Sequence, residues 1–217
     1  MDEVPVETTL YSLSDEPPAP FGQRQGERRD GERHLSLFRV GSLTLGDRRE
    51  LCLIRNVSSG GMMVRAYCPI EPGTRLSVEL KEGQNVAGTA AWADGSNVGI
   101  TFDKPVDVVE LLATSMDGPR PRMPRVEVRC FATLRDGARV LRLWTRDISQ
   151  GGVKVETRHE IASGATVVVT LPGLEPQAGT VRWQDKDCYG VTFNKLIPLR
   201  VLVAWLHQQR EAMRSAN

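Results

Sequence analysis

The sequence has no excess of charge of either sign, few aromatic residues and no long apolar run. Its 28 basic and 27 acidic residues nearly cancel, so no global field draws the protein onto nucleic acid, and any anion site must be local. No segment approaches the about 20 apolar residues of a membrane-spanning helix. The N-terminus is acidic and shows neither the basic region nor the apolar stretch of a signal peptide. We therefore expect a cytoplasmic protein without direct membrane insertion.

Cysteine is also scarce, and the groups needed for catalysis do not recur. The four cysteines, Cys52, Cys68, Cys130 and Cys188, form no C-x-x-C pair and have no histidine at ligand spacing, which disfavours a zinc site. Their even number permits disulfides, but without an export signal we expect reduced, buried thiols. No nucleophile–base pair or paired carboxylate set repeats along the chain. We expect no enzyme, no metal and no cofactor.

What the sequence does contain is a repeat. Residues 55–61 read Arg-Asn-Val-Ser-Ser-Gly-Gly, and residues 146–152, 91 positions later, read Arg-Asp-Ile-Ser-Gln-Gly-Gly. The same offset relates four further pairs of segments without an insertion, which predicts two tandem domains of about 90 residues each. Each copy places a short acceptor side chain, a hydroxyl and two glycines after an apolar run. This composition predicts a tight turn between strands, in which glycine lets a ligand approach the backbone closely.

Apolar residues alternate with polar ones from Leu35 onward, and turn residues interrupt the pattern every eight to twelve positions. This is typical of small antiparallel β-barrels or sandwiches. The residues expected to face the two cores are Met62, Val64, Ala66, Leu76, Val78 and Leu80, with Val153, Val155, Thr157, Val167, Val169 and Leu171. After each last strand the period changes to that of a helix, which is longer in the second copy. We expect Trp92 and Trp183 to lie in the core or at a domain interface.

The chain is predicted to divide into four parts. Residues 1–24 are rich in proline and poor in large apolar side chains, which predicts a disordered lead. A first barrel domain over 25–114 and a second over 125–217, the latter with a long C-terminal helix, flank a proline-rich linker at 115–124.

Arginines precede both predicted barrels. In the first copy Arg29 and Arg33 are four residues apart, with Arg28 beside them, and Arg33 lies 23 residues before Asn56. In the second copy Arg125 lies 22 residues before Asp147 and is the counterpart of Arg33. Pro121 takes the place of Arg29, between Arg120 and Arg122, so the second copy lacks the regular arginine spacing.

The combination of R-x-x-x-R with [DN]-x-S-x-x-G in a small β-barrel that ends in a helix resembles the PilZ domain family, bacterial receptors for cyclic di-GMP. The resemblance covers residues 26–213 in two copies and implies two tandem six-stranded antiparallel β-barrels, each followed by a C-terminal helix. It implies cyclic di-GMP as the ligand. The implied ligand-binding residues are Arg28, Arg29, Arg33, Asn56, Ser58, Gly60 and Gly61 in the first domain and, less favoured, Arg120, Arg122, Arg125, Asp147, Ser149 and Gly152 in the second.

Guanidinium groups suit this ligand because they bind phosphate oxygens or the O6/N7 edge of guanine bidentately and stack on bases. We expect ligand binding to order the arginine arm against the first barrel and thereby to signal to a downstream protein that the sequence does not identify. The alternative is an adaptor of the same fold that binds no nucleotide and contacts proteins through its second barrel and C-terminal helix. A DNA or RNA binder is disfavoured, because aromatics make up only 6% of the chain.

Overall fold

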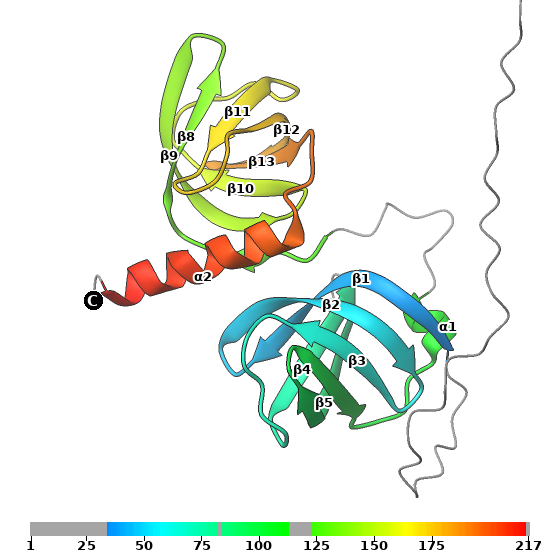
Figure 1. Cartoon of the computed structure of the whole chain (residues 1–217). Coiled ribbons are helices and arrows are strands. Elements are labelled where there is room, and N and C mark those ends of the chain that lie inside the picture. The colour runs from blue at the N-terminus through cyan, green and yellow to red at the C-terminus, as the bar shows by residue number, and fades with distance from the viewer. Residues whose placement is uncertain (1–33, 82–83, 113–122, 216–217) are drawn as a thin grey trace, which may run out of the picture. The chain divides into compact units, whose positions relative to one another are not determined.

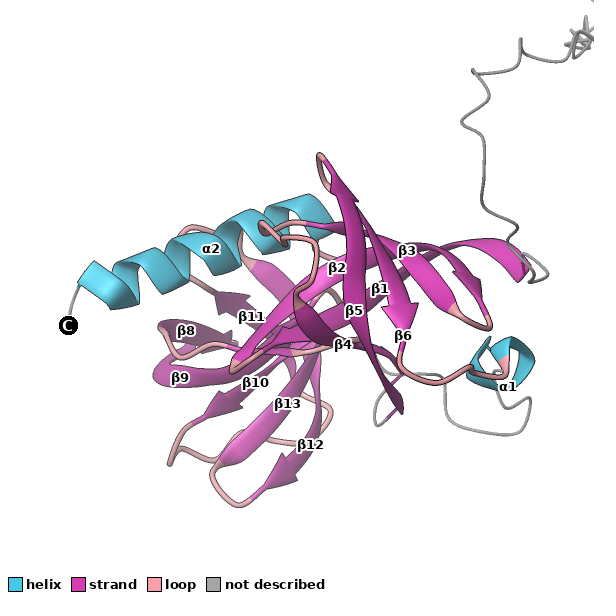
Figure 2. Ribbon diagram, turned by 90° about the horizontal axis from the view of Figure 1, so that it is seen from below, coloured by secondary structure: helices cyan, strands magenta, loops and turns pink. Residues whose placement is uncertain are grey.

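The computed structural model describes residues 34–81, 84–112 and 123–215 of the 217-residue chain. Strands dominate this part of the chain, and the described residues form two helices (Figures 1 and 2). No helix in these ranges is long and apolar enough to cross a membrane. The predicted lead and linker, and hence the predicted domain boundaries, lie largely outside the described residues.

The first barrel is closed and antiparallel. Its strands are β1 (His34–Leu45), β2 (Arg48–Ser58), β3 (Gly61–Ala66), β4 (Arg75–Lys81), β5 (Gln84–Asp94) and β6 (Asn97–Phe102). They are ordered β1-β2-β3-β6-β5-β4, and pairing of β1 with β4 closes the barrel. A five-residue helix, α1 (Val108–Leu112), follows β6, and Asp107 caps it by accepting hydrogen bonds from the backbone of Val109 and Glu110.

The second barrel repeats this topology. Its strands are β7 (Val126–Glu127), β8 (Phe131–Asp136), β9 (Arg139–Ser149), β10 (Gly152–Glu156), β11 (Thr166–Thr170), β12 (Gln177–Asp185) and β13 (Cys188–Phe193). Strands β8 to β13 close into a six-stranded barrel through the pairing of β10 with β9, and the short β7 adds to β9. The fold class predicted from the sequence, two six-stranded antiparallel barrels with terminal helices, is therefore confirmed.

One strand of the first barrel is broken into two in the second. Residues 126–136, which contain β7 and β8, correspond to β1, but the backbone leaves the sheet at 128–130. The first barrel has a register shift at the equivalent place, between Ser36 and Arg39. At the break in the second barrel lies Thr145, which stands where the first barrel has Ile54. Its buried hydroxyl donates to the Val128 carbonyl at 2.7 Å and accepts from the Cys130 backbone N–H at 2.9 Å. The side-chain hydroxyl thus satisfies two backbone groups that an isoleucine could not.

The alternation predicted from the sequence describes both cores. Of the twelve residues expected to face inward, all are buried, including the polar Thr157. The long helix α2 (Leu199–Ser215) packs onto its own barrel through Leu202, Val203, Trp205 and Leu206. The indole N–H of Trp205 donates to the Pro172 carbonyl at 2.7 Å, which fixes the helix beside the β11–β12 connection.

Candidate functional site

The motif residue Asn56 reaches the outer wall of the first barrel because β2 carries a bulge. Strict alternation would place Asn56 inside, two residues after the buried Ile54. Instead the register between β2 and β3 shifts between Ile54 and Asn56, so Arg55 is the extra residue and Val57 becomes the next buried position. Asn56 is exposed as a result. The second barrel has the same irregularity between Thr145 and Asp147.

Hydrogen bonds hold the motif turn in a fixed shape. Ser58 pairs with Gly61 across the two-residue connection, and the Ser58 hydroxyl donates to the Gly61 carbonyl at 3.1 Å. The Oδ1 atom of Asn56 accepts from the Met63 backbone N–H at 3.1 Å. Because that bond uses the side-chain oxygen, the amide N–H₂ group of the exposed Asn56 remains available as a donor.

The turn is also tied to the end of the barrel. The Gly60 carbonyl accepts from the backbone N–H of Phe102, and the Ser59 carbonyl accepts from that of Val106. The equivalent bonds recur in the second barrel, from Phe193 to Gly151 and from Ile197 to Gln150. The polar motif therefore stands on a rigid scaffold that leads directly into the segment before each helix.

Glycine occupies the two motif positions, Gly60 and Gly61, for different structural reasons. A Cβ atom on Gly61 would lie 2.4 Å from the Ile100 carbonyl oxygen, so glycine is required for β3 and β6 to approach each other. A Cβ atom on Gly60 would meet nothing within 4 Å. Neither glycine has a positive φ. Gly61 is thus explained by packing alone, whereas Gly60 leaves an open surface at the turn.

In the second barrel the same turn is already covered by the chain's own residues. The guanidinium of Arg125 forms a partly buried ion pair with the Asp147 carboxylate. The sulfur of Met123 lies 3.2 Å, and the Leu196 side chain 3.4 Å, from the Cβ position of Gly151. Ser149 is buried and donates to the Gly152 carbonyl at 3.3 Å. The sequence motif is kept, but its surroundings differ from those of the first barrel.

Backbone register places the residues that follow Arg33 and Arg125 beside the motif strands. In the second barrel Val126, the residue after Arg125, pairs with Ile148. In the first barrel His34, the residue after Arg33, pairs with Val57. Val57 and Ile148 occupy equivalent places, directly after Asn56 and Asp147. Arg33 and Arg125 therefore precede the same register position, which accounts for the one-residue difference in their sequence separation from the motif.

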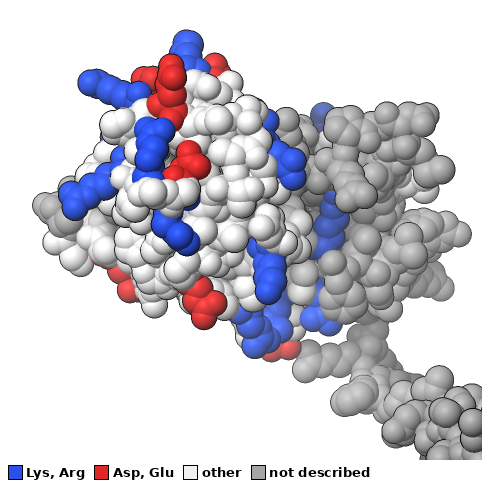
Figure 3. Space-filling view, turned by 90° about the horizontal axis from the view of Figure 1, so that it is seen from above, with Lys and Arg blue, Asp and Glu red and all other residues white. Residues whose placement is uncertain are grey.

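The remaining arginines expected at the site, Arg28, Arg29, Arg33, Arg120 and Arg122, lie outside the described residues. Elsewhere, a surface cavity of about 330 Å³ lies between β5 and α1, but its charged lining residues, Asp107 and Glu110, are acidic and do not suit a phosphate. No group of three or more potential metal ligands occurs in the described ranges. Lys and Arg side chains are spread over the surface among Asp and Glu in the space-filling view (Figure 3).

The two repeated tryptophans were expected in the core or at a domain interface, and they are not core residues. Trp92 and Trp183 are each 39% exposed. Their indole rings lie against Gly99 and Gly190, where a Cβ atom would come within 2.1 Å of the ring. The ring covers the glycine of the neighbouring strand on the outside of the barrel, which is why this Trp–Gly pair occurs in both copies.

Comparison with known proteins agrees with the repeat. The PilZ domain matches residues 23–114 and, a second time, residues 119–208. No protein among curated sequences matches the chain. Among solved structures, Borreliella burgdorferi PlzA in complex with c-di-GMP is 12% identical, with 77% of this chain and 86% of that chain covered and a TM-score of 0.36.

Two further solved structures are similar to the same extent. Escherichia coli YcgR in complex with c-di-GMP is 12% identical, with 82% of this chain and 86% of that chain covered and a TM-score of 0.35. The K. pneumonia MrkH–c-di-GMP complex is 16% identical, with 82% and 90% covered and a TM-score of 0.34. The match to the PilZ domain covers most of the sequence in two copies. It indicates no enzymatic family. The chain therefore belongs to the PilZ domain family.

Proposed function

We propose that this protein is a cyclic di-GMP receptor whose principal site is the motif turn of the first barrel. The ligand-binding residues in this proposal are Arg28, Arg29, Arg33, Asn56, Ser58, Gly60 and Gly61. The observation that carries the proposal is the equivalent register of His34 and Val126, the residues that follow Arg33 and Arg125, beside the two motif turns. In the second barrel that register brings the arm arginine onto the motif carboxylate, so the same register in the first barrel supports an approach of Arg33 to Asn56.

The available amide N–H₂ group of Asn56 suits a guanine base. Guanine presents two acceptors, O6 and N7, on its major-groove edge, and an amide N–H₂ group donates to such atoms. The arginines would neutralise the phosphodiesters or pair bidentately with guanine. Gly60 leaves space above the turn for the base, because nothing lies within 4 Å of its Cβ position. Each part of the nucleotide thus has a chemically matched group in or directly before the first barrel.

Signalling in this proposal follows from ordering of the arm. Arg28, Arg29 and Arg33 precede β1, whereas Asn56 and Ser58 belong to a turn that is hydrogen-bonded to the barrel end. A ligand that contacts both sets would hold the arm against the barrel, and that new surface would be available to a partner protein.

The second barrel has a different role in the proposal. A ligand at its turn would have to displace Arg125 from Asp147 and Met123 from Gly151. The Asp147 carboxylate also lacks the donor that Asn56 offers, and it would repel a phosphate. Arg120, Arg122, Arg125, Asp147, Ser149 and Gly152 therefore form a weaker nucleotide site or none. The second barrel instead provides the adaptor function, contact with a downstream protein.

Isothermal titration with cyclic di-GMP tests the proposal. A hydrogen bond to a charged group is worth about 1.5–3 kcal/mol, so Arg29→Ala and Arg33→Ala should each weaken binding by roughly ten- to a hundred-fold. Arg125→Ala is the matched control and should leave the affinity within about two-fold. Absence of binding heat with the unaltered protein, or full binding by both first-domain variants, would disprove the proposal. Loss of binding in Arg125→Ala alone would assign the principal site to the second barrel.

A further inference from the structure

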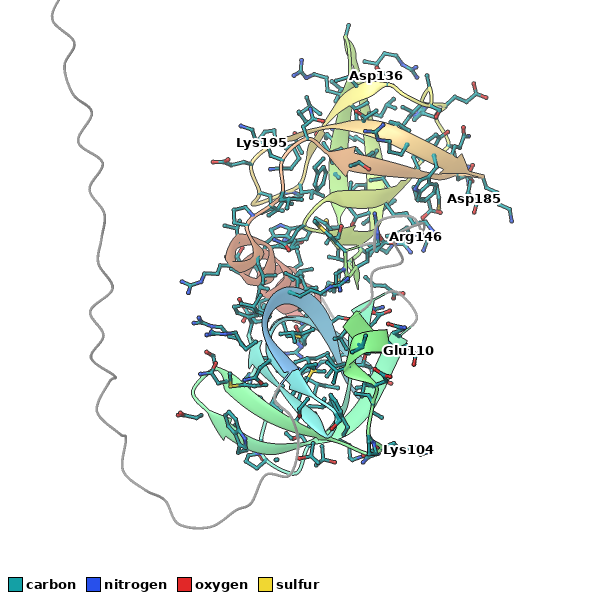
Figure 4. The ribbon with its side chains drawn as sticks, turned by 90° about the vertical axis from the view of Figure 1, so that its right-hand side faces the viewer. Lys104, Glu110, Asp136, Arg146, Asp185 and Lys195 are labelled. Atoms are coloured by element: carbon teal, nitrogen blue, oxygen red, sulfur yellow. The ribbon has the colours of Figure 1, made fainter. Side chains whose placement is uncertain are left out.

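The outer face of the hairpin formed by β8 and β9 carries an unusual set of side chains. Strand alternation and pairing place Phe131 opposite Trp144 and Arg135 opposite Val140, with Arg142 opposite Thr133 between them. Arg129 precedes β8 on the same line of alternate residues. We call the six residues Arg129, Phe131, Arg135, Val140, Arg142 and Trp144 the arginine–aromatic face. Figure 4 labels Asp136, the last residue of β8 beside the hairpin turn, and Arg146, toward the other end of β9.

Apolar atoms are exposed at both ends of this face. Phe131 is 56% exposed although its ring lies against Trp144, with ring centroids 3.6 Å apart. Val140, near the hairpin turn, is 63% exposed. The guanidinium of Arg129 stands over the Trp144 ring, 5.1 Å from its centroid, and thereby holds a cation beside the aromatic pair.

The face also holds positive charge that the chain does not neutralise. Arg135 and Arg142 are exposed and form no ion pair with any residue of the described ranges. Arg146, on the same strand as Arg142, pairs with Glu156 at 2.7 Å and is therefore neutralised. Excess arginine is thus concentrated on one hairpin of a protein whose net charge is only +1.

The fold does not require these residues, because the first barrel lacks them. At the positions 91 residues earlier, Phe131 and Trp144 correspond to Val40 and Leu53, while Arg135 and Arg142 correspond to Thr44 and Leu51. The two hairpins have the same place in their barrels. The arginine–aromatic face is therefore a property of the second barrel alone and needs an explanation other than barrel formation.

We propose that the arginine–aromatic face binds an acidic segment of a partner protein that also carries aromatic or aliphatic side chains. Carboxylates would pair with Arg135 and Arg142, and apolar side chains would pack on Phe131, Trp144 and Val140, a combination that is typical of protein interfaces. Single-stranded nucleic acid fits less well, because its successive bases stack on successive aromatic side chains, and the exposed Val140 offers no ring for stacking. The inference rests on the partner-binding role proposed for the second barrel and is independent of nucleotide binding.

Fluorescence anisotropy with a labelled random copolymer of glutamate and tyrosine tests this inference. The unaltered protein should bind it, and affinity should fall as salt is added. The double variant Arg135→Glu/Arg142→Glu should bind about a hundred-fold more weakly. Arg182→Glu is the matched control, because Arg182 is an exposed arginine of the same barrel on β12 and should leave binding unchanged. Phe131→Ala should weaken binding of the copolymer about ten-fold and binding of pure polyglutamate little.

Three results would overturn the inference: no binding of the copolymer, equal losses in the Arg182→Glu control, or tighter binding of oligothymidylate that the double variant abolishes. The last result would identify a nucleic-acid surface. Far-ultraviolet circular dichroism of each variant excludes loss of fold, which is not expected for outer-face residues. Titration of the double variant with cyclic di-GMP separates the two proposals, since it should bind the nucleotide like the unaltered protein.

Discussion

The two glycines of the first motif turn, Gly60 and Gly61, differ in how tightly they pack against the barrel. From the sequence, Gly60 and Gly61 are one feature, a flexible pair beneath a ligand. The structure separates them, because only Gly61 lies against the backbone of β6, with its Cβ position 2.4 Å from the Ile100 carbonyl oxygen. No sequence pattern distinguishes them, since the distance depends on how β3 and β6 cross.

This difference predicts opposite outcomes for two neighbouring substitutions. Gly61→Ala should destabilise the first barrel by about 1–3 kcal/mol, because backbone must move to admit the methyl group. Gly60→Ala should change stability by less than about 0.5 kcal/mol, since its added atom meets open space. Urea unfolding followed by circular dichroism measures both. Equal destabilisation by the two alanines would contradict the assigned packing role.

Burial of Cys52 predicts a pH dependence at alkaline pH. The thiol is fully buried, and desolvation raises its pKa from an ordinary 9.0 to about 12. Between these values the unfolded chain loses the Cys52 proton while the folded protein keeps it. Stability contributed by this group is therefore complete below pH 9 and declines as pH rises toward 12.

The decline should approach about 1.4 kcal/mol per pH unit and should be absent from Cys52→Ala. The quantity to measure is the difference in unfolding free energy between the two proteins across this pH range, which cancels the titration of other groups. Parallel pH profiles for the two proteins would show that the thiol does not titrate with unfolding.

At the scale of strands and helices, the sequence predicts the repeating pattern well and its irregularities poorly. Inward positions such as Val64 and Val155 follow from period two and from the repeat, and both are buried. The bulge at Arg55 was not predicted, although the three-residue spacing between the apolar Ile54 and Val57 is a signal for it. That bulge turns Asn56 outward, so the alternation alone gives the wrong side for a proposed binding residue. The sequence contains no comparable signal for the register of β1 with β2 or of β7 with β9. The proposed approach of Arg33 to Asn56 rests on that register.

The hydroxyl of Thr145 bridges two backbone groups at the break between β7 and β8. Thr145→Val keeps the side-chain shape but leaves the buried Cys130 N–H and Val128 carbonyl without this partner. We expect a loss of about 1–3 kcal/mol. Thr192→Val, at an exposed threonine of the same barrel, is the control and should change stability by less than about 0.5 kcal/mol. Thermal unfolding measures both variants, and an unchanged midpoint for Thr145→Val would show that these hydrogen bonds do not stabilise the second barrel.

At the scale of the whole molecule, duplication has produced two barrels with the same topology and different surfaces. The motif turn is common to both, but Arg125 and Met123 cover it in the second copy, and the arginine–aromatic face occurs only there. The displaced arginine spacing indicated this asymmetry in the sequence. The sequence did not predict the Arg125–Asp147 contact, because that contact depends on the register of β7 with β9.

This asymmetry predicts that cyclic di-GMP stabilises one barrel and not the other. Each barrel encloses its own apolar core, so we expect two unfolding transitions in differential scanning calorimetry. A ligand that binds only the folded first barrel stabilises it by about 2.7 kcal/mol at a hundred times its dissociation constant, which raises that transition by several degrees. The transition of the second barrel should not move.

Thr145→Val identifies the transition of the second barrel, because it should lower that midpoint alone, and Gly61→Ala should likewise lower only the midpoint of the first. Arg33→Ala is expected to reduce the shift caused by the nucleotide to about half or less, without altering either midpoint in its absence. A shift of the transition sensitive to Thr145 would place the nucleotide on the second barrel. The interpretation of Arg125 as an occupant of that turn would then be wrong, because the ligand would have displaced it from Asp147.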